Sequence, residues 1–223
     1  MMTGGVDAVI FDYGGVLTSP VGLSIAAWLE RDAIDPGSFS RTLKAWLSRS
    51  APQGTPIHRL ETGELSTDEF DALLAAELVG TNGGPVASEG LLRSLFAEMR
   101  PDPAMFDLVE DIKDAGVRVA LLSNSWGNTY PRERINALFD PVVISGEVGM
   151  RKPNADIFDH ALELLAVEPS AAVFVDDAAP NIDGATRAGL HAVLHTDAQT
   201  TRRELTRFVP GLSADIPSQK ETT

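Results

Sequence analysis

The sequence predicts an α/β protein with a doubly wound parallel sheet and a helical insertion near its start. After residue 100, short apolar runs alternate with stretches of helical spacing, which is typical of parallel sheets. Residues 18–99 instead show helical spacing and no convincing strand. We therefore expect a core formed by residues 1–17 and 100–210, an inserted helical domain over 18–99, and a loose polar tail over 211–223.

The core elements are predicted by apolar runs and by helix-boundary residues. Residues 6–11 form a mostly apolar run that ends at Asp12 and two glycines, as a buried strand ends at a sharp turn. Asp102 can cap a helix that Gly116 ends. Further elements are expected as a strand over 117–122, a helix with Ile135 and Leu138, a strand over 142–144, a helix over 157–165, a strand over 173–175, a helix over 180–188 and a strand over 192–194.

The inserted segment, residues 18–99, is expected to consist of helices and loops. Three groups of apolar residues recur there at helical spacing, and Ser66–Glu69 offers helix-start chemistry. Residues 81–85 form a loop rich in Asn and Gly. We expect the acidic run 61–71 to be a solvated helix entry.

Composition narrows the class of protein. The chain has 223 residues, of which 43% are hydrophobic, and this suffices for a real core. A net charge of −14 argues against a nucleic-acid partner. The absence of cysteine excludes disulfides and thiolate catalysis. Without a signal peptide or a membrane-length apolar stretch, we expect a cytoplasmic protein with no membrane association. The sequence gives no indication of oligomeric state.

Polar residues follow each of the first four predicted strands. Asp12 follows the first strand, Ser123-Asn124 the second, and Asp176-Asp177 the fourth, while Lys152 lies in the loop after the third. Each one alone is compatible with a turn, a cap or a surface residue. Together they converge on the carboxyl edge of the sheet, where open α/β sheets bind ligands.

The acidic residues at this edge suit a magnesium ion and a carboxylate nucleophile. A carboxylate can attack phosphorus, and Mg²⁺ prefers carboxylate, carbonyl and water oxygens. Asp12, Asp177 and the backbone carbonyl of Gly14 are candidate ligands, and Asp176 could bind directly or through a water.

The remaining candidates suit a phosphate group. Lys152 would offset negative charge and hold both Asp12 and a phosphate oxygen. Ser123 and its neighbouring backbone N–H groups would donate to the other phosphate oxygens, and Asn124 is counted among the phosphate-binding residues.

These residues lie in four motifs that resemble the haloacid dehalogenase (HAD) superfamily, subfamily I with a helical C1-type cap. The motifs are V-I-F-D-Y-G-G-V-L at 9–17, L-L-S-N at 121–124, R-K-P-N-A-D-I-F at 151–158 and V-F-V-D-D-A-A-P-N at 173–181. The resemblance implies a Rossmann-like core, phosphorylation of Asp12, Mg²⁺ held by Asp12, Gly14 and Asp177, and Lys152 and Ser123 orienting the transferred group. It also implies a cap that closes over the site and sets substrate choice.

One position departs from the family pattern. Phosphatases of this family usually carry a second aspartate, the general acid/base, two residues after the nucleophile, where this chain has Gly14. A water, a side chain of the inserted segment such as Glu61 or Glu64, or an acidic leaving group could replace it. Sugar-1-phosphates and acyl phosphates have such leaving groups.

The function that we expect is a Mg²⁺-dependent phosphatase acting on a small phosphorylated metabolite. One alternative is a metal-independent 2-haloacid dehalogenase, although dehalogenases of this family usually have an aromatic residue in place of Gly14. Another is a binding or regulatory protein with weak turnover. A phosphoacceptor receiver domain is disfavoured, because there the acidic pair lies near the N-terminus and the acceptor aspartate in mid-chain.

Overall fold

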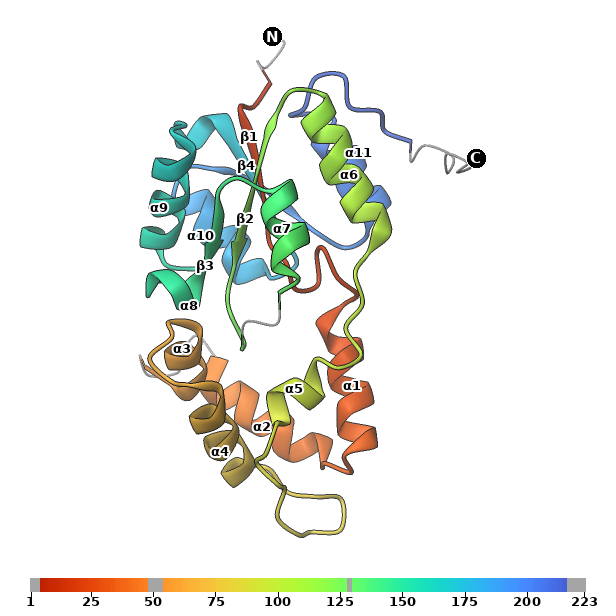
Figure 1. Cartoon of the computed structure of the whole chain (residues 1–223), viewed down its shortest axis with the longest axis vertical. Helices are drawn as coiled ribbons and strands as arrows, with labels where there is room; N and C mark the ends of the chain where they lie inside the picture. The colour runs from red at the N-terminus through yellow and green to blue at the C-terminus, as the bar shows by residue number, and fades with distance from the viewer. Residues whose placement is uncertain (1–4, 48–53, 128–129, 216–223) are drawn as a thin grey trace.

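The core of the protein is a five-stranded sheet. The computed structural model describes residues 5–47, 54–127 and 130–215. All strand pairs are parallel and the order is β3-β2-β1-β4-β5, which confirms the predicted doubly wound sheet (Figure 1). Its strands are β1 (Ala8–Phe11), β2 (Arg118–Ser123), β3 (Val142–Ile144), β4 (Ala172–Asp176) and β5 (His191–Leu194). The strand order reverses between β1 and β4, and such a switch point leaves a crevice at the carboxyl ends of the strands.

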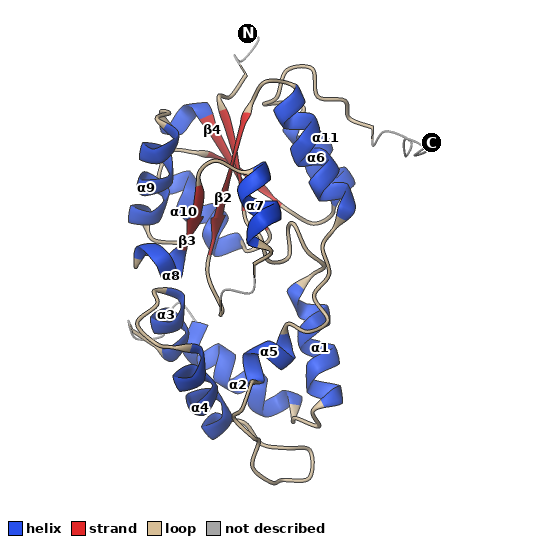
Figure 2. Cartoon of the chain, viewed as in Figure 1, coloured by secondary structure: helices blue, strands red, loops and turns tan. Residues whose placement is uncertain are grey.

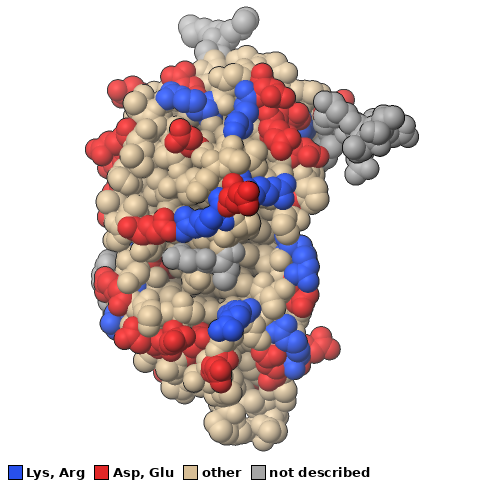
Figure 3. Space-filling view, in the orientation of Figure 1, with Lys and Arg blue, Asp and Glu red and all other residues tan. Residues whose placement is uncertain are grey.

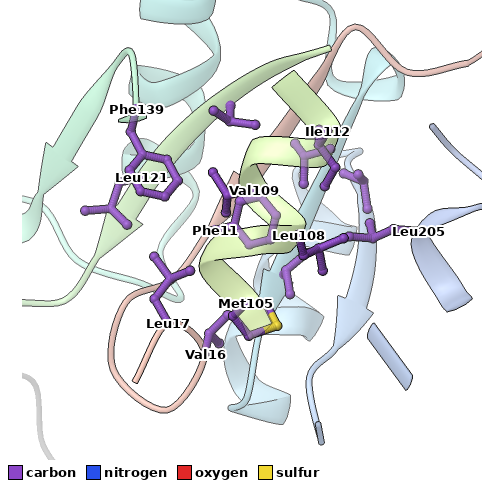
Figure 4. Close-up of a cluster of buried hydrophobic side chains, with 14 of the residues drawn as sticks. Phe11, Val16, Leu17, Met105, Leu108, Val109, Ile112, Leu121, Phe139 and Leu205 are labelled. Carbon is purple, nitrogen blue, oxygen red and sulfur yellow. The ribbon is translucent and has the colours of Figure 1, made fainter. Parts of the chain in front are cut away.

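Helices cover both faces of the sheet (Figure 2). The core helices are α6 (Pro103–Asp114), α7 (Arg132–Leu138), α8 (Ser145–Val148), α9 (Ala155–Leu165), the 3₁₀ turn η1 (Pro169–Ala171), α10 (Ala179–Arg187) and α11 (Ala198–Leu205). Because side chains alternate along a strand, Phe11 and Leu121 pack with α6, α7 and α11, as Figure 4 shows in part. Ile10 and Phe174 point the other way and pack with α9 and α10.

The two predicted boundaries of α6 are confirmed. The Asp102 side chain accepts a hydrogen bond from the backbone N–H of Ala104 at 2.9 Å, which caps α6. Gly116 follows α6 with a φ of +83°, a conformation that favours glycine. The sequence did not predict α11, because only Leu205 is apolar among the buried residues of this helix.

The inserted segment is helical in its described part. Its helices are α1 (Val21–Arg31), α2 (Pro36–Leu47), α3 (Pro56–Glu61), α4 (Thr67–Glu77) and α5 (Leu91–Leu95). They enclose an apolar cluster of their own that includes Trp28 and Phe70. Ser66 and Glu69 bond each other's backbone N–H groups in a capping box at the start of α4, as Ser66–Glu69 predicted.

The prediction that residues 61–71 form a solvated helix entry is wrong for both ends of the run. Glu61 and Asp71 are 4% and 2% exposed. Asp71 accepts a hydrogen bond from the backbone N–H of Leu92 at 3.0 Å, at the start of α5. Both carboxylates are buried because their partners come from distant segments, which local charge patterning does not reveal.

The surface and the ends of the chain show three further features. None of the described helices is long and apolar enough to cross a bilayer. On the face in Figure 3, basic side chains are interleaved with acidic ones. In the predicted tail, the carbonyls of Ser213 and Ala214 accept hydrogen bonds from Arg202 and Gln199 of α11. Residues 216–223 lie outside the described part.

Candidate active site

A buried lysine joins two aspartates at the switch point of the sheet. Asp12 directly follows β1, and Asp176 is the last residue of β4. Lys152, which precedes α9 and is 1% exposed, donates to Asp12 Oδ1 and to Asp176 Oδ2, both at 2.7 Å. The structure therefore brings together three residues that are up to 164 positions apart in the sequence.

Asp177 completes a cluster of three carboxylates. Asp12, Asp176 and Asp177 each offer one oxygen, and these oxygens lie within 4.8 Å of one another. Among the three carboxylates, Asp176 accepts the most hydrogen bonds from the protein. Its Oδ1 accepts from the backbone N–H of Ala178 at 2.8 Å, and its Oδ2 accepts from Lys152. Asn181 Nδ2 also donates to both oxygens of Asp176. Asp12 and Asp177 therefore have more free lone pairs for a cation.

The turn after Asp12 depends on glycine at one of its two glycine positions. Gly15 has a φ of +81°, and a Cβ added there would stand 2.3 Å from Asp177 Oδ2. At Gly14 an added Cβ would meet only Val21 Cγ2, at 3.6 Å. Asp177 is therefore packed against Gly15, while Gly14 has space for a side chain.

This difference gives a matched pair of variants. Gly15→Ala should weaken Mg²⁺ binding by about 10–100-fold, because Asp177 must move aside. Its positive φ adds a strain of roughly 1–2 kcal/mol. Gly14→Ala should leave Mg²⁺ affinity within about threefold of the wild type, since its Cβ makes only ordinary contact. Mg²⁺ titration by calorimetry checks both, and equal affinities in the two variants would contradict this account of Gly15.

The cluster carries more negative than positive charge. Burial raises the pKa of Asp12, Lys152 lowers it, and Asp176 and Asp177 raise it, which together bring it to about 7. Burial, and then Asp176, also raise the pKa of Asp177. Burial alone would lower the pKa of Lys152, but Asp12 and Asp176 raise it, so the ammonium stays charged. One lysine thus faces three carboxylates, and a bound cation would relieve the excess.

This charge imbalance predicts how stability depends on pH. Asp12 has a pKa of about 7 in the folded chain against 3.8 for a free side chain, so the folded state holds its proton more tightly. The contribution of Asp12 to stability should therefore fall as pH rises from about 4 to about 7 without metal, and saturating Mg²⁺ should remove this fall. Thermal unfolding of the wild type and Asp12→Asn in EDTA and in Mg²⁺ isolates the effect. A wild-type/variant difference that is independent of pH in EDTA would contradict it.

Ser123 and Asn124 have partners that the sequence did not reveal. Tyr130, a residue that the sequence did not single out, donates its hydroxyl hydrogen to Ser123 Oγ at 2.9 Å. The Asn124 side chain accepts from the backbone N–H of Lys152 at 2.9 Å and donates to the Lys152 carbonyl at 3.1 Å. The side-chain amide of Asn124 therefore holds the loop that carries Lys152. The group of Asn124 that can still donate a hydrogen bond to a phosphate is its backbone N–H.

Glu61 of the inserted segment reaches the site, whereas Glu64 does not line it. Glu61 Oε1 accepts from Trp126 Nε1 at 2.9 Å, and Oε2 accepts from Arg151 Nε at 2.5 Å. The backbone carbonyl of Glu61 accepts from Ser145 Oγ at 2.6 Å. The end of α3 is thus bonded to the core beside a cavity of about 280 Å³, which Asp12 and Lys152 also line.

The fold is a parallel sheet, and at its switch point a buried lysine holds an aspartate that follows a strand. This combination suits an α/β enzyme of the hydrolase class with a carboxylate nucleophile. Comparison with protein-family models makes the assignment specific. The chain belongs to the haloacid dehalogenase-like hydrolases, whose model matches residues 6–189. The family resemblance found in the sequence is thereby confirmed.

Two relatives show how far the similarity extends. The chain is 31% identical over 206 residues to the mouse acyl-CoA dehydrogenase family member 10, in an alignment that covers 89% of this chain but 18% of that protein. The chain thus spans less than a fifth of that relative's length. It is 28% identical over 220 residues to a phosphatase of Mycobacterium tuberculosis, and that alignment covers 94% of this chain and 96% of the relative.

Solved structures share the fold. One is a mutant of a HAD family enzyme from Bacteroides thetaiotaomicron in complex with magnesium and inorganic phosphate, which aligns with a TM-score of 0.63 and 19% identity. The alignment covers 86% of this chain and 95% of that chain. At this identity, the likeness shows the common fold alone.

Proposed function

We propose that the protein is a Mg²⁺-dependent phosphatase that acts on a small phosphorylated metabolite through an aspartyl-phosphate on Asp12. The observation that carries the proposal is the buried Lys152 between Asp12 and Asp176, with Asp177 beside them at the switch point. The similar protein of M. tuberculosis is named a phosphatase, which supports the same chemistry here.

The chain's own residues account for the first chemical step. An Asp12 carboxylate oxygen attacks phosphorus, and the bond between phosphorus and the leaving oxygen breaks, so that the phosphoryl group is carried by Asp12. Lys152 uses two of its three N–H donors on carboxylates and keeps one for a phosphate oxygen. The Ser123 hydroxyl and the backbone N–H of Asn124 are the further donors. The backbone N–H of Ser125 already bonds Ser145 Oγ and does not contribute.

The residues at the site fit a divalent cation. Three carboxylate oxygens lie within 4.8 Å of one another, and one lysine leaves their charge uncompensated. Asp12, Asp177 and the Gly14 carbonyl would hold Mg²⁺, and Asp176 would act directly or through a water. When bound, Mg²⁺ neutralises the repulsion between the attacking carboxylate and the phosphate.

The position at which related phosphatases carry their general acid is occupied by Gly14, which has no proton to donate. Glu61 does not fill this role, since both its carboxylate oxygens accept hydrogen bonds from Trp126 and Arg151. Neither of these two positions can therefore protonate the leaving group, and this favours esters of weakly basic alcohols or acids. Because Gly14 and Glu61 do not protonate the leaving group, we expect a low turnover number for ordinary alkyl phosphates.

The test is hydrolysis of p-nitrophenyl phosphate with Mg²⁺ and with EDTA, beside halide release from 2-chloropropionate. We expect phosphate release that needs Mg²⁺ and no halide release. Halide release in EDTA would replace the proposal with metal-independent dehalogenation, for which the missing aspartate at Gly14 is the favouring observation. Beryllium fluoride binding without turnover of any ester would instead indicate a regulatory protein.

A further inference from the structure

The cavity at Asp12 has two sides of different chemistry. Its polar lining residues lie at the sheet edge around Asp12 and Lys152, together with Glu61. The inserted segment lines the cavity with Val21 and Ile25 at the start of α1 and with two residues that follow α5. Figure 1 shows α1 and α5 in the region beyond the carboxyl ends of the strands. The apolar lining residues from outside the sheet edge are Val21, Ile25, Phe96, Met99 and Trp126.

Two polar groups beside this apolar side, the Trp126 indole N–H and the Tyr130 hydroxyl, already have partners. Trp126 Nε1 donates to Glu61 at 2.9 Å, and the second Glu61 oxygen is taken by Arg151. The Tyr130 hydroxyl donates to Ser123 at 2.9 Å. The Trp126 ring packs against Phe96, with centroids 6.3 Å apart, so the aromatic group is fixed in place. The rings of Trp126 and Phe96 therefore present apolar surface to a ligand.

The apolar side begins next to the reacting group. Gly14 lies two residues after Asp12, and Val21 Cγ2 is 3.6 Å from the place where a Gly14 Cβ would stand. The organic part of a phosphate ester bound at Asp12 would therefore lie close to Val21, with Ile25 further along the same cavity wall. A substrate with hydroxyl groups there would lose hydrogen bonds to water without gaining partners from these residues.

We propose that the apolar side formed by Val21, Ile25, Phe96, Met99 and Trp126 selects phosphate esters of weakly basic leaving groups whose organic part is short and apolar, such as aryl and acyl phosphates, rather than a polyol. The inference rests on the phosphatase function proposed above and specifies its substrate class. A cavity of about 280 Å³ lies just below the usual size of ligand pockets, so the apolar group is short.

The test measures binding separately from turnover. Calorimetry with Mg²⁺ gives the dissociation constants of propyl-, butyl-, pentyl- and hexylphosphonate, which cannot be hydrolysed. We expect affinity to rise about fourfold per methylene until the cavity is full. Butylphosphonate should bind at least about tenfold more tightly than its 3,4-dihydroxy analogue.

Variants locate the effect. Ile25→Ala, and Met99→Gln as a near-isosteric polar replacement, should each reduce the gain per methylene to about twofold or less. Leu23→Ala is the matched control, because Leu23 lies on the same helix, is 65% exposed and does not line the cavity. It should leave the gain unchanged.

The outcomes separate the two proposals. Mg²⁺-dependent hydrolysis of p-nitrophenyl phosphate with phosphonate affinities that are independent of chain length would overturn the apolar specificity alone. Chain-length-dependent affinity without turnover of any monoester would overturn the phosphatase function alone. Tighter binding of the dihydroxy analogue, or no binding of any phosphonate, would also reject the apolar specificity.

Discussion

Asp12→Asn should lower the turnover of p-nitrophenyl phosphate by about 10⁴-fold or more, because the amide cannot serve as the attacking carboxylate. The loss should appear in kcat, since Lys152, Ser123 and the backbone still bind the phosphate. We do not expect the metal-free variant to unfold more easily. It removes a buried carboxylate whose pKa is raised to about 7, and Lys152 keeps its bond to Asp176 at 2.7 Å.

Asp7→Asn is the control for this experiment. Asp7 lies just before the opposite end of β1 and is exposed, so the same chemical change there should leave kcat unaltered. Mass spectrometry of the acid-quenched enzyme should detect a phosphorylated residue 12 in the wild type. Residual Mg²⁺-dependent turnover above about one per cent in Asp12→Asn would show that another residue is the nucleophile.

Gly14→Asp should raise the hydrolysis of alkyl phosphates by up to about 10²–10⁴-fold, because it supplies the general acid/base that the chain lacks. The structure has room for it, since a Cβ at this position meets only Val21 Cγ2 at 3.6 Å. The gain should be small for p-nitrophenyl phosphate, whose leaving group needs no proton. A plot of rate against the pKa of the leaving alcohol should therefore be steep in the wild type and flatter in the variant.

Gly14→Asn is the matched control, with the same shape but no transferable proton. It should show the steep dependence of the wild type. If Asp and Asn at position 14 alter alkyl phosphate hydrolysis equally, the gain has a cause other than proton transfer. If neither alters it, a general acid that we have not identified already acts in the wild type.

The sheet could be predicted from the sequence because its signals are local. The apolar runs that ended at Asp12, Ser123 and Asp176-Asp177 proved to be β1, β2 and β4, each within about a residue of its expected end. That Asp12 and Lys152 lie close together could be predicted because the carboxyl ends of parallel strands meet at one edge of the sheet. A short helix such as α8 was not predicted, since four residues carry too little periodicity.

The parts that were not predicted depend on contacts between distant segments. Glu61 was expected to be solvated, yet it bonds Trp126 and Arg151, which lie 65 and 90 positions away. Tyr130 was not recognised because an isolated aromatic residue after Ser123 has no pattern to mark it. Nor does the sequence show that the Asn124 amide is committed to Lys152, since both its bonds are to backbone atoms 28 positions away.

The central place of β1 constrains how the chain folds as it is synthesised. Ala8 pairs with Arg118 on one side and with Ala172 on the other, so the strand made first waits for about half of the chain before its first neighbour exists. The helices made in between surround Trp28 and Phe70 and can condense meanwhile. On the emerging chain β1 therefore stays unpaired until β2 has been made, and its association with β2 is a non-local step of the kind that slows folding.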